Sequence, residues 1–152
     1  MKHEVIFLGK TKDSFISEGI KEYTSRLKHY TQFVTRVIKE KKAGGKADIT
    51  QEGRKLLEAI PAGWLVVALD SRGKQYTSEQ FAGTISGWEQ RGVKGACYLI
   101  GGPTGISGEV ISRADLCLSL SEMTFTHDMV RMLLVEQIYR AYTIKAGEKY
   151  HK

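Results

Sequence analysis

Cysteine is scarce in this chain. Its two cysteines, Cys97 and Cys117, each stand alone inside an apolar stretch. A zinc centre needs about four ligands at close spacing, so this sequence excludes a zinc centre and predicts no metal site. Both thiols are expected to be small buried hydrophobic groups.

Long hydrophobic runs are also missing. No apolar run approaches the roughly 20 residues that a membrane-spanning helix needs. The N-terminal run, residues 5–8, is too short for the core of a signal peptide. We therefore expect a cytoplasmic protein that has no membrane partner.

Familiar catalytic fingerprints are absent as well. The glycine-rich segment IGGPTG, residues 100–105, lacks the Gly-Lys-Ser/Thr of a P-loop and does not match GxGxxG. The chain has no GxSxG motif, and neither cysteine is near a histidine in sequence. These absences disfavour a generic nucleotide-binding enzyme and a hydrolase with a serine or cysteine nucleophile.

The composition is that of one globular domain. The 152 residues are 41% hydrophobic and 26% charged, so we expect a single domain over residues 1–152. Lysine and arginine total 23 against 17 aspartate and glutamate, a net charge of +6. This excess favours an anionic partner, with nucleic acid first, although a merely soluble basic protein is the alternative.

Hydrophobic periodicity predicts strands that alternate with helices. Short apolar or β-branched runs predict strands over residues 5–8, 33–38, 64–69, 96–100 and 116–120. Helical spacing predicts helices over residues 13–30, 49–60, 78–91, 108–114 and 129–144. The alternation indicates an α/β fold with a mostly parallel sheet flanked by helices.

Three details of this prediction matter later. The buried face of the first helix is expected to consist of Phe15, Ile16, Ile20, Tyr23 and Leu27. The segment DSRGK after the third strand is expected to be a turn. The basic, glycine-rich residues 39–48 are expected to form a mobile loop.

Small and polar residues follow three of the predicted strands, at residues 69–73, 100–105 and 120–125. Ligands of parallel sheets bind beyond the carboxyl ends of the strands, so we predict one site built from three loops. The loop LSEMTFTH mixes apolar and hydroxyl side chains, which suits an adenine-like ring. The alternative is an ordinary start of a helix, capped by Thr126 or Asp128.

Few side chains in the C-terminal half can handle protons or stabilise charge. The candidates are His127, Arg131, Arg140, Tyr150 and His151. His3 and His29 are expected to be solvated. Glu136 and Arg140, four apart on a helix, would ordinarily form a surface ion pair. The terminal Tyr-His-Lys would ordinarily fray, yet it could also stack on a base and contact phosphate.

The motifs together resemble one family. LDSRGK (69–74), IGGPTG (100–105), LSEMTFTHDMVRMLLVEQIYRAYTI (120–144) and GEKYHK (147–152) are similar to those of the ribosomal RNA large subunit methyltransferase H family, and so are VIFLGK (5–10) and EYTSRL (22–27). The likeness covers essentially the whole chain. It implies the SPOUT methyltransferase fold with a C-terminal trefoil knot, which rules of chain topology alone would exclude.

The resemblance also implies an activity and its partners. Members are homodimers that use S-adenosyl-L-methionine to methylate N3 of a pseudouridine in a 23S rRNA hairpin, helix 69, on the assembled ribosome. By motif, the cofactor pocket is expected at Leu69, Gly101, Leu120, Ser121, Glu122, Met123, Thr124 and Phe125. The matching substrate and catalytic residues are Arg140, Tyr150 and His151.

General chemistry suggests roles for these three residues, whose positions come from the motif. We hypothesise that His151 accepts the N3 proton, because imidazole titrates near neutrality, and that Arg140 holds a uracil carbonyl oxygen. Tyr150 would stack on the base or hydrogen-bond to it. The chain departs from the family at Thr126, where proline is usual. Threonine can cap the helix instead, although the loop is then expected to be looser before cofactor binds.

Two further expectations concern RNA. Lys145, Lys149, Lys152 and the basic loop 39–46 are candidates for phosphate contact, which supplies affinity that depends on salt; the alternative for the loop is that it is only solvated. The competing function is a non-catalytic ribosome- or RNA-binding protein of the same fold. A methyltransferase acting on a different base or RNA also remains open.

Overall fold

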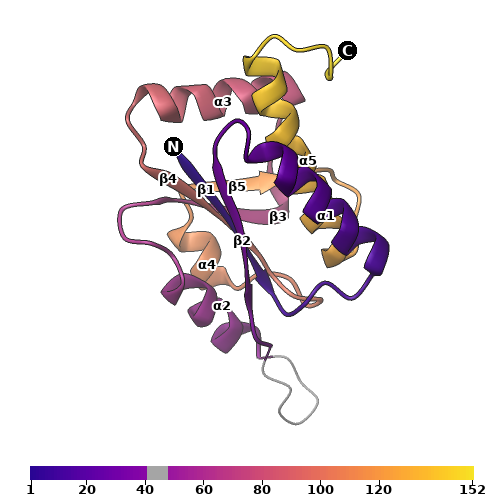
Figure 1. Ribbon diagram of the computed structural model, residues 1–152. Helices are drawn as coiled ribbons and strands as arrows, with labels where there is room; N and C mark the ends of the chain where they lie inside the picture. The colour runs from indigo at the N-terminus through magenta and orange to yellow at the C-terminus, as the bar shows by residue number, and fades with distance from the viewer. Residues whose placement is uncertain (41–47) are drawn as a thin grey trace.

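The computed structural model describes residues 1–40 and 48–152 and consists of a parallel sheet with helices on both faces (Figure 1). The sheet has the order β2-β1-β4-β3-β5, and every neighbouring pair is parallel. Its strands are β1 (Lys2–Leu8), β2 (Gln32–Ile38), β3 (Leu65–Gln75), β4 (Gly95–Ile100) and β5 (Leu116–Ser119). The predicted α/β fold is confirmed.

Within the described residues, four helices connect the strands, α1 (Ser14–Leu27), α2 (Ile49–Glu58), α3 (Ser78–Gln90) and α4 (Gly108–Arg113), and a fifth, α5 (His127–Lys145), follows β5. One core cluster lies under α1, α3 and α5, and a second lies under α2 and α4, on the other face of the sheet (Figure 1). The central strand β4 is buried at every position, as its apolar run predicted.

Local sequence fixes where the helices begin. A short polar side chain caps each one and accepts a hydrogen bond from a backbone N–H of the first turn. These caps are Asp13, Asp48, Thr77, Ser107 and Thr126. The last helix therefore begins at His127, two residues before the predicted start, because Thr126 serves as its cap.

The predicted turn after the third strand is wrong. The chain bulges out over residues 70–73 and then resumes pairing with β5, so that Leu69 and Lys74 both align with Leu118. The Asp70 carboxylate accepts three hydrogen bonds from Arg72, which close the bulge and lower the pKa of Asp70. A bulge re-aims side chains at a strand end, and here it faces the site described below.

The predicted solvation of His3 is also wrong, whereas His29 is exposed as expected. His3 lies on β1, which is covered by helices on both faces, and is 1% exposed. Its Nδ1 lies 3.1 Å from the Tyr98 hydroxyl and its Nε2 lies 2.7 Å from the Tyr142 hydroxyl. Burial lowers the pKa of His3 to about 3, so the ring is neutral.

Phe15 is a third correction. The periodicity placed it on the buried face of α1, but its side chain is 84% exposed, while Ile16, Ile20 and Leu27 are buried as predicted. Phe15 lies in the first turn of the helix, beyond the edge of the stripe that packs on α5. Tyr23 packs partly buried against the core.

Other expectations have mixed outcomes. Cys97 is buried, but Cys117 is half-buried. Within residues 1–40 and 48–152, no helix is long and apolar enough to cross a membrane. In the same residues, no group of three or more His, Cys, Asp or Glu side chains could hold a metal ion. Of the basic loop 39–46, residues 41–46 lie outside the described residues.

Candidate functional site

A pocket of about 490 Å³ lies at the carboxyl edge of the sheet, where the segments after β3, β4 and β5 meet. Its walls are mainly apolar side chains and glycine backbone, formed by Leu69, Asp70, Ser71, Ile100, Gly101, Gly102, Pro103, Gly105, Ile106, Leu118, Leu120, Ser121, Met123, Thr124, Phe125, Thr126, His127 and Val130. The structure thus brings together the three strand ends that the sequence singled out. The volume is in the range of small-molecule sites.

Most of the residues that the resemblance assigned to a cofactor line this pocket. Leu69, Gly101 and Leu120 come from its three strand ends, and Ser121, Met123, Thr124 and Phe125 come from the loop that leads to α5. Glu122 is exposed and does not line the pocket. The loop's apolar members lie open to solvent, with Met123 74% and Phe125 37% exposed.

A tight turn forms one wall of the pocket. The N–H of Gly105 donates to the carbonyl of Gly102 at 3.0 Å. A Cβ on Gly101 would lie 2.2 Å from the carbonyl oxygen of Gly105. Because backbone fills that space, only glycine fits at Gly101 without moving the turn.

The bulge of β3 forms another part of the wall and is connected to the loop after β5. The hydroxyl of Ser119 lies 3.1 Å from the carbonyl of Ser71 and 3.0 Å from the carbonyl of Ser121. Ser121 in turn accepts the N–H of Met123 with its hydroxyl. Small hydroxyl side chains therefore fix the backbone of both loops where they face the pocket.

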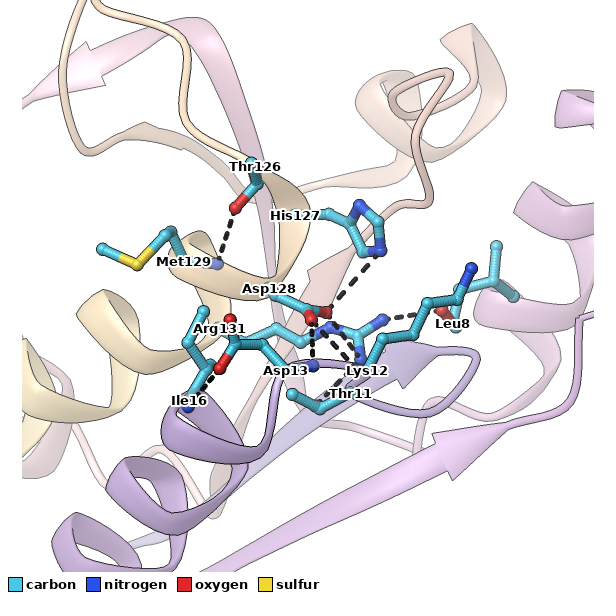
Figure 2. A network of polar contacts seen from close by, with 10 residues as sticks. All are labelled: Leu8, Thr11, Lys12, Asp13, Ile16, Thr126, His127, Asp128, Met129 and Arg131. Atoms are coloured by element: carbon cyan, nitrogen blue, oxygen red, sulfur yellow. Dashed lines mark hydrogen bonds and ion pairs between the residues drawn. The ribbon is translucent and has the colours of Figure 1, made fainter.

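Buried charges hold the first turn of α5 beside the pocket (Figure 2). Arg131 is fully buried; it donates to the carbonyl of Leu8 at 2.7 Å and to the Thr11 hydroxyl at 3.0 Å. Its guanidinium also lies 4.8 Å from the centre of the Phe7 ring. Burial lowers the pKa of Arg131, and the nearby Asp128 carboxylate opposes that shift. Arg131, a candidate from sequence, is thus a structural cation that lies away from the pocket.

The candidate catalytic residues gather in a second place, which we call the tail cluster: Glu79, Glu136, Arg140, Tyr150 and His151. Arg140 donates two hydrogen bonds to Oε1 of Glu136, at 3.0 and 2.7 Å, and these raise its pKa. Its Nη1 also lies 3.1 Å from Nδ1 of His151, whose Nε2 lies 2.7 Å from Glu79. The Glu136–Arg140 pair is therefore part of a network rather than an isolated ion pair.

The end of the chain is docked rather than frayed. Gly147, at a φ of +70°, ends α5, and the N–H of Glu148 then bonds back to the carbonyl of Thr143. Tyr150 packs edge-on against Tyr139, with ring centres 4.8 Å apart, and its hydroxyl donates to Glu136. Burial raises the pKa of Tyr150, and the hydrogen bond to Glu136 adds to this shift.

The pocket and the tail cluster are separated within the chain. His127 at the pocket and Arg140 in the tail cluster lie 13 positions apart on one helix, which corresponds to about 20 Å at 1.5 Å per residue. One copy of the chain therefore does not bring its tail to its own pocket in this structure.

Comparison with known proteins gives the family. A family model described as "Predicted SPOUT methyltransferase" matches residues 1–151. The chain belongs to the SPOUT methyltransferase family. A protein of Desulfotalea psychrophila named ribosomal RNA large subunit methyltransferase H is 59% identical over 153 residues and covers 100% of both chains. A protein of the same name from Halothermothrix orenii is 39% identical, again over 100% of both chains.

A solved structure supports the SPOUT fold. A probable methylase family protein from Haemophilus influenzae superposes with a TM-score of 0.55 at 10% identity, covering 97% of this chain and 67% of that one. Such low identity supports the shared fold alone. The trefoil knot stays a prediction of the family resemblance.

Sequence reasoning missed several residues of this SPOUT site. Asp70 and Ser71 were expected in the three-loop site but as part of a turn, whereas Glu79 carried no signal because it is 72 positions from its partner His151. Lys145, a candidate for phosphate contact, pairs with Glu89 and lies over the Tyr142 ring, two contacts that the sequence did not indicate. Only strand pairing and tail docking, which involve distant residues, create these contacts.

Proposed function

We propose that this SPOUT methyltransferase uses S-adenosyl-L-methionine to methylate N3 of a pseudouridine in helix 69 of 23S rRNA, on the assembled ribosome. It would act in the cytoplasm as a homodimer. Family membership and the names of the full-length relatives support an action on large-subunit rRNA. The finer details rest on the motif resemblance.

The observation that carries the proposal is the fit of the pocket to the methyl donor. Its apolar walls around Leu69, Leu120 and Phe125 suit an adenine ring, and glycine backbone at Gly101 lets a ligand lie close to the chain. The wall residues include no lysine or arginine, which suits a ligand that carries a positive sulfonium. When bound, S-adenosyl-L-methionine supplies an electrophilic methyl group, so the transfer needs no metal.

The tail cluster supplies the groups that the target base needs. Pseudouridine N3 carries an imide proton and is a poor nucleophile until that proton leaves. We assign its removal to His151 and the stabilisation of charge on a carbonyl oxygen to Arg140. Tyr150, held edge-on against Tyr139, would stack on the base.

The hydrogen bonds of the tail cluster suggest how these roles are coupled. Nδ1 of His151 accepts from Arg140 and is therefore not free to take a proton from the base. If Arg140 turns to a carbonyl oxygen of the base, Nδ1 is released. Glu79 then holds the Nε2–H and keeps the ring oriented. Substrate binding would thus switch His151 into a proton acceptor.

The separation of about 20 Å between pocket and tail supports a homodimer in which each tail serves the other copy's pocket. The exposed Met123 and Phe125 agree with this, because covering an apolar loop at the pocket mouth with a second copy removes apolar surface from water, which is favourable. A second groove beside it, which Phe125, Leu120 and Leu133 help to line, extends the apolar surface along α5.

Thermal melting of the purified protein tests the pocket. We expect S-adenosyl-L-methionine and S-adenosylhomocysteine to raise the melting temperature, by about 5–10 °C at 100 times the dissociation constant. ATP and NAD should not raise it. No shift with either S-adenosyl compound would favour the non-catalytic RNA-binding alternative, provided that ribosomes do not restore the shift.

Methyl transfer tests the target. Ribosomes from a strain that lacks its own methyltransferase of this kind should accept one labelled methyl group from S-adenosyl-L-methionine. Mass spectrometry of nuclease fragments should place it on N3 of a pseudouridine in helix 69. Methylation at another base would keep the enzyme class and overturn the target.

A further inference from the structure

Phe15 is an exposed aromatic side chain that the packing of the fold does not explain. It is the most exposed large hydrophobic residue in the described part of the chain, at 84%. Its neighbour Ile16 is buried, so α1 packs on α5 without any help from Phe15. An exposed aromatic group at a defined position is a candidate binding element.

The segment that carries Phe15 is held rigidly. Oδ2 of Asp128 accepts the backbone N–H groups of Lys12 and Asp13, at 3.0 and 3.1 Å. The Asp13 side chain then caps α1 by accepting the N–H of Phe15 at 2.9 Å. Figure 2 shows the side chains of Asp128 and Arg131 pointing at this loop from α5. Phe15 is thus presented by a fixed loop, which lowers the entropy cost of binding through it.

This loop lies beside the pocket. It follows β1, and the pocket lies at the same edge of the parallel sheet, beyond β3, β4 and β5. The first turn of α5 joins the two, because Thr126 and His127 line the pocket while Asp128 holds the loop. A nucleic acid that extends from the pocket past the first turn of α5 would therefore reach the loop that carries Phe15.

The charge of the loop indicates the partner. Lys10 and Lys12 are both exposed, and neither forms an ion pair within the described residues. The one acidic side chain between Lys12 and Phe15, Asp13, is engaged by backbone N–H groups. Lysine is depleted in the core of protein–protein interfaces. An aromatic ring that follows two lysines without ion pairs among the described residues fits single-stranded nucleic acid instead.

We propose that Phe15 is a stacking platform for an unpaired RNA base next to the target nucleotide, and that Lys10 and Lys12 contact the adjoining phosphates. This inference rests on the proposed function, since it names a further contact with the same rRNA substrate. Stacking supplies affinity with little choice of base, and the lysines supply affinity that depends on salt.

The test is ribosome binding and methyl transfer by Phe15→Ala, Phe15→Trp and the double variant Lys10→Ala/Lys12→Ala. Loss of one stacked base should weaken ribosome binding and raise the KM for ribosomes roughly 5- to 140-fold. Phe15→Trp should restore both. The double lysine variant should reduce the slope of log affinity against log salt by about 1.4, for two phosphates on a single strand.

Matched controls are Val34→Ala, which truncates another exposed apolar side chain, and Lys94→Ala, which removes an exposed charge at the opposite edge of the sheet. Neither should change ribosome affinity. The melting shift with S-adenosyl-L-methionine should stay unchanged in Phe15→Ala, because the ring does not line the pocket.

Two results would overturn the inference. One is a Phe15→Ala protein that binds ribosomes as tightly as the wild type. The other is a Phe15→Ala protein that has lost self-association by light scattering, which would make this surface an interface between copies. Failure of the proposed function looks different: wild-type protein would then bind ribosomes without transferring methyl, and the binding comparison would still decide the role of Phe15.

Discussion

Arg140 donates a hydrogen bond from Nη1 to Nδ1 of His151, over 3.1 Å. A guanidinium has only donors, so Nδ1 must be the unprotonated nitrogen, and Nε2 carries the hydrogen toward Glu79. The contacts of His151 with α5 and α3 thus set its tautomer. The His151 ring is therefore oriented by both contacts, but its Nδ1 accepts a hydrogen bond until Arg140 moves away.

Replacing His151 tests its role as proton acceptor. His151→Ala should lower the rate of methyl transfer at saturating ribosomes about 10²- to 10⁴-fold, the usual contribution of a general base. The melting shift with S-adenosyl-L-methionine should stay, because His151 does not line the pocket of its own chain and is assigned to the target base rather than to the cofactor. His29→Ala, at an exposed histidine elsewhere, is the control and should be silent. Equal loss of cofactor binding and transfer would remove the assignment.

Glycine at position 101 is predicted to be indispensable to the pocket. In Gly101→Ala, the new Cβ would lie 2.2 Å from the carbonyl oxygen of Gly105, so the turn must shift. We expect the melting shift with S-adenosyl-L-methionine to disappear while circular dichroism still reports a folded protein. Gly83→Ala, where nothing lies within 4 Å of the added atom, should bind normally and gain up to about 1 kcal/mol of stability.

The buried His3 predicts a loss of stability in mild acid. Its pKa is about 3 when folded and 6.5 when unfolded, so the unfolded chain binds more protons between these values. The stabilisation is complete above pH 6.5 and is lost as pH falls toward 3. Between pH 7.5 and 4.5 the loss from this group is about 2–3 kcal/mol.

Urea denaturation at both pH values measures this change in the free energy of unfolding. NMR should show one histidine ring that does not titrate above pH 5. That signal should be missing in His3→Asn, and the variant should lose less stability in acid than the wild type. A His3 ring that titrates near pH 6.5 in the folded protein would contradict the burial argument.

The sequence predicted the sheet well, because continuous apolar runs such as the one in β4 have few alternatives in an α/β chain. It also identified the strand ends of the pocket, since parallel strands must place their carboxyl ends at one edge. It failed at His3, whose burial depends on hydroxyl partners from β4 and α5. It failed in the same way at the bulge before Lys74, because only the partner strand β5 shows where pairing resumes.

The Asp128–Arg131 pair predicts coupled losses of stability. Asp128→Asn leaves the buried guanidinium without its nearby charge, and Arg131→Met removes the bonds to Leu8 and Thr11. Each change should cost roughly 3 kcal/mol. The double variant should lose at least about 1 kcal/mol less stability than the sum of the two single losses. Each single variant leaves one charge without its partner, and the double variant has no such unpaired charge.

Urea denaturation of the four proteins gives this double-mutant cycle. The pair Glu22 and Arg26 on α1 is the matched control, because both side chains are largely exposed and Glu22→Gln should cost only a few tenths of a kcal/mol. If the two stability losses at Asp128 and Arg131 are strictly additive, the two charges do not interact energetically despite their separation of 3.7 Å.

We expect Thr126→Pro to fold, because the motif resemblance predicts proline at this position. The residue has a φ of −60°, which proline adopts without strain, and its N–H has no hydrogen-bond acceptor among the described residues. Loss of the hydroxyl that accepts the N–H of Met129 should lower the stability by about 1 kcal/mol. Proline also restricts the unfolded chain, which should raise the stability by about 0.4–1 kcal/mol. The melting temperature should therefore change by only a few degrees. Thr126→Ala, which loses the cap without that compensation, should melt at a lower temperature than the proline variant.

Since proline also stiffens the pocket loop, S-adenosyl-L-methionine should bind Thr126→Pro at least as tightly as the wild type in calorimetry. A tenfold weaker affinity would show that the pocket needs the threonine hydroxyl.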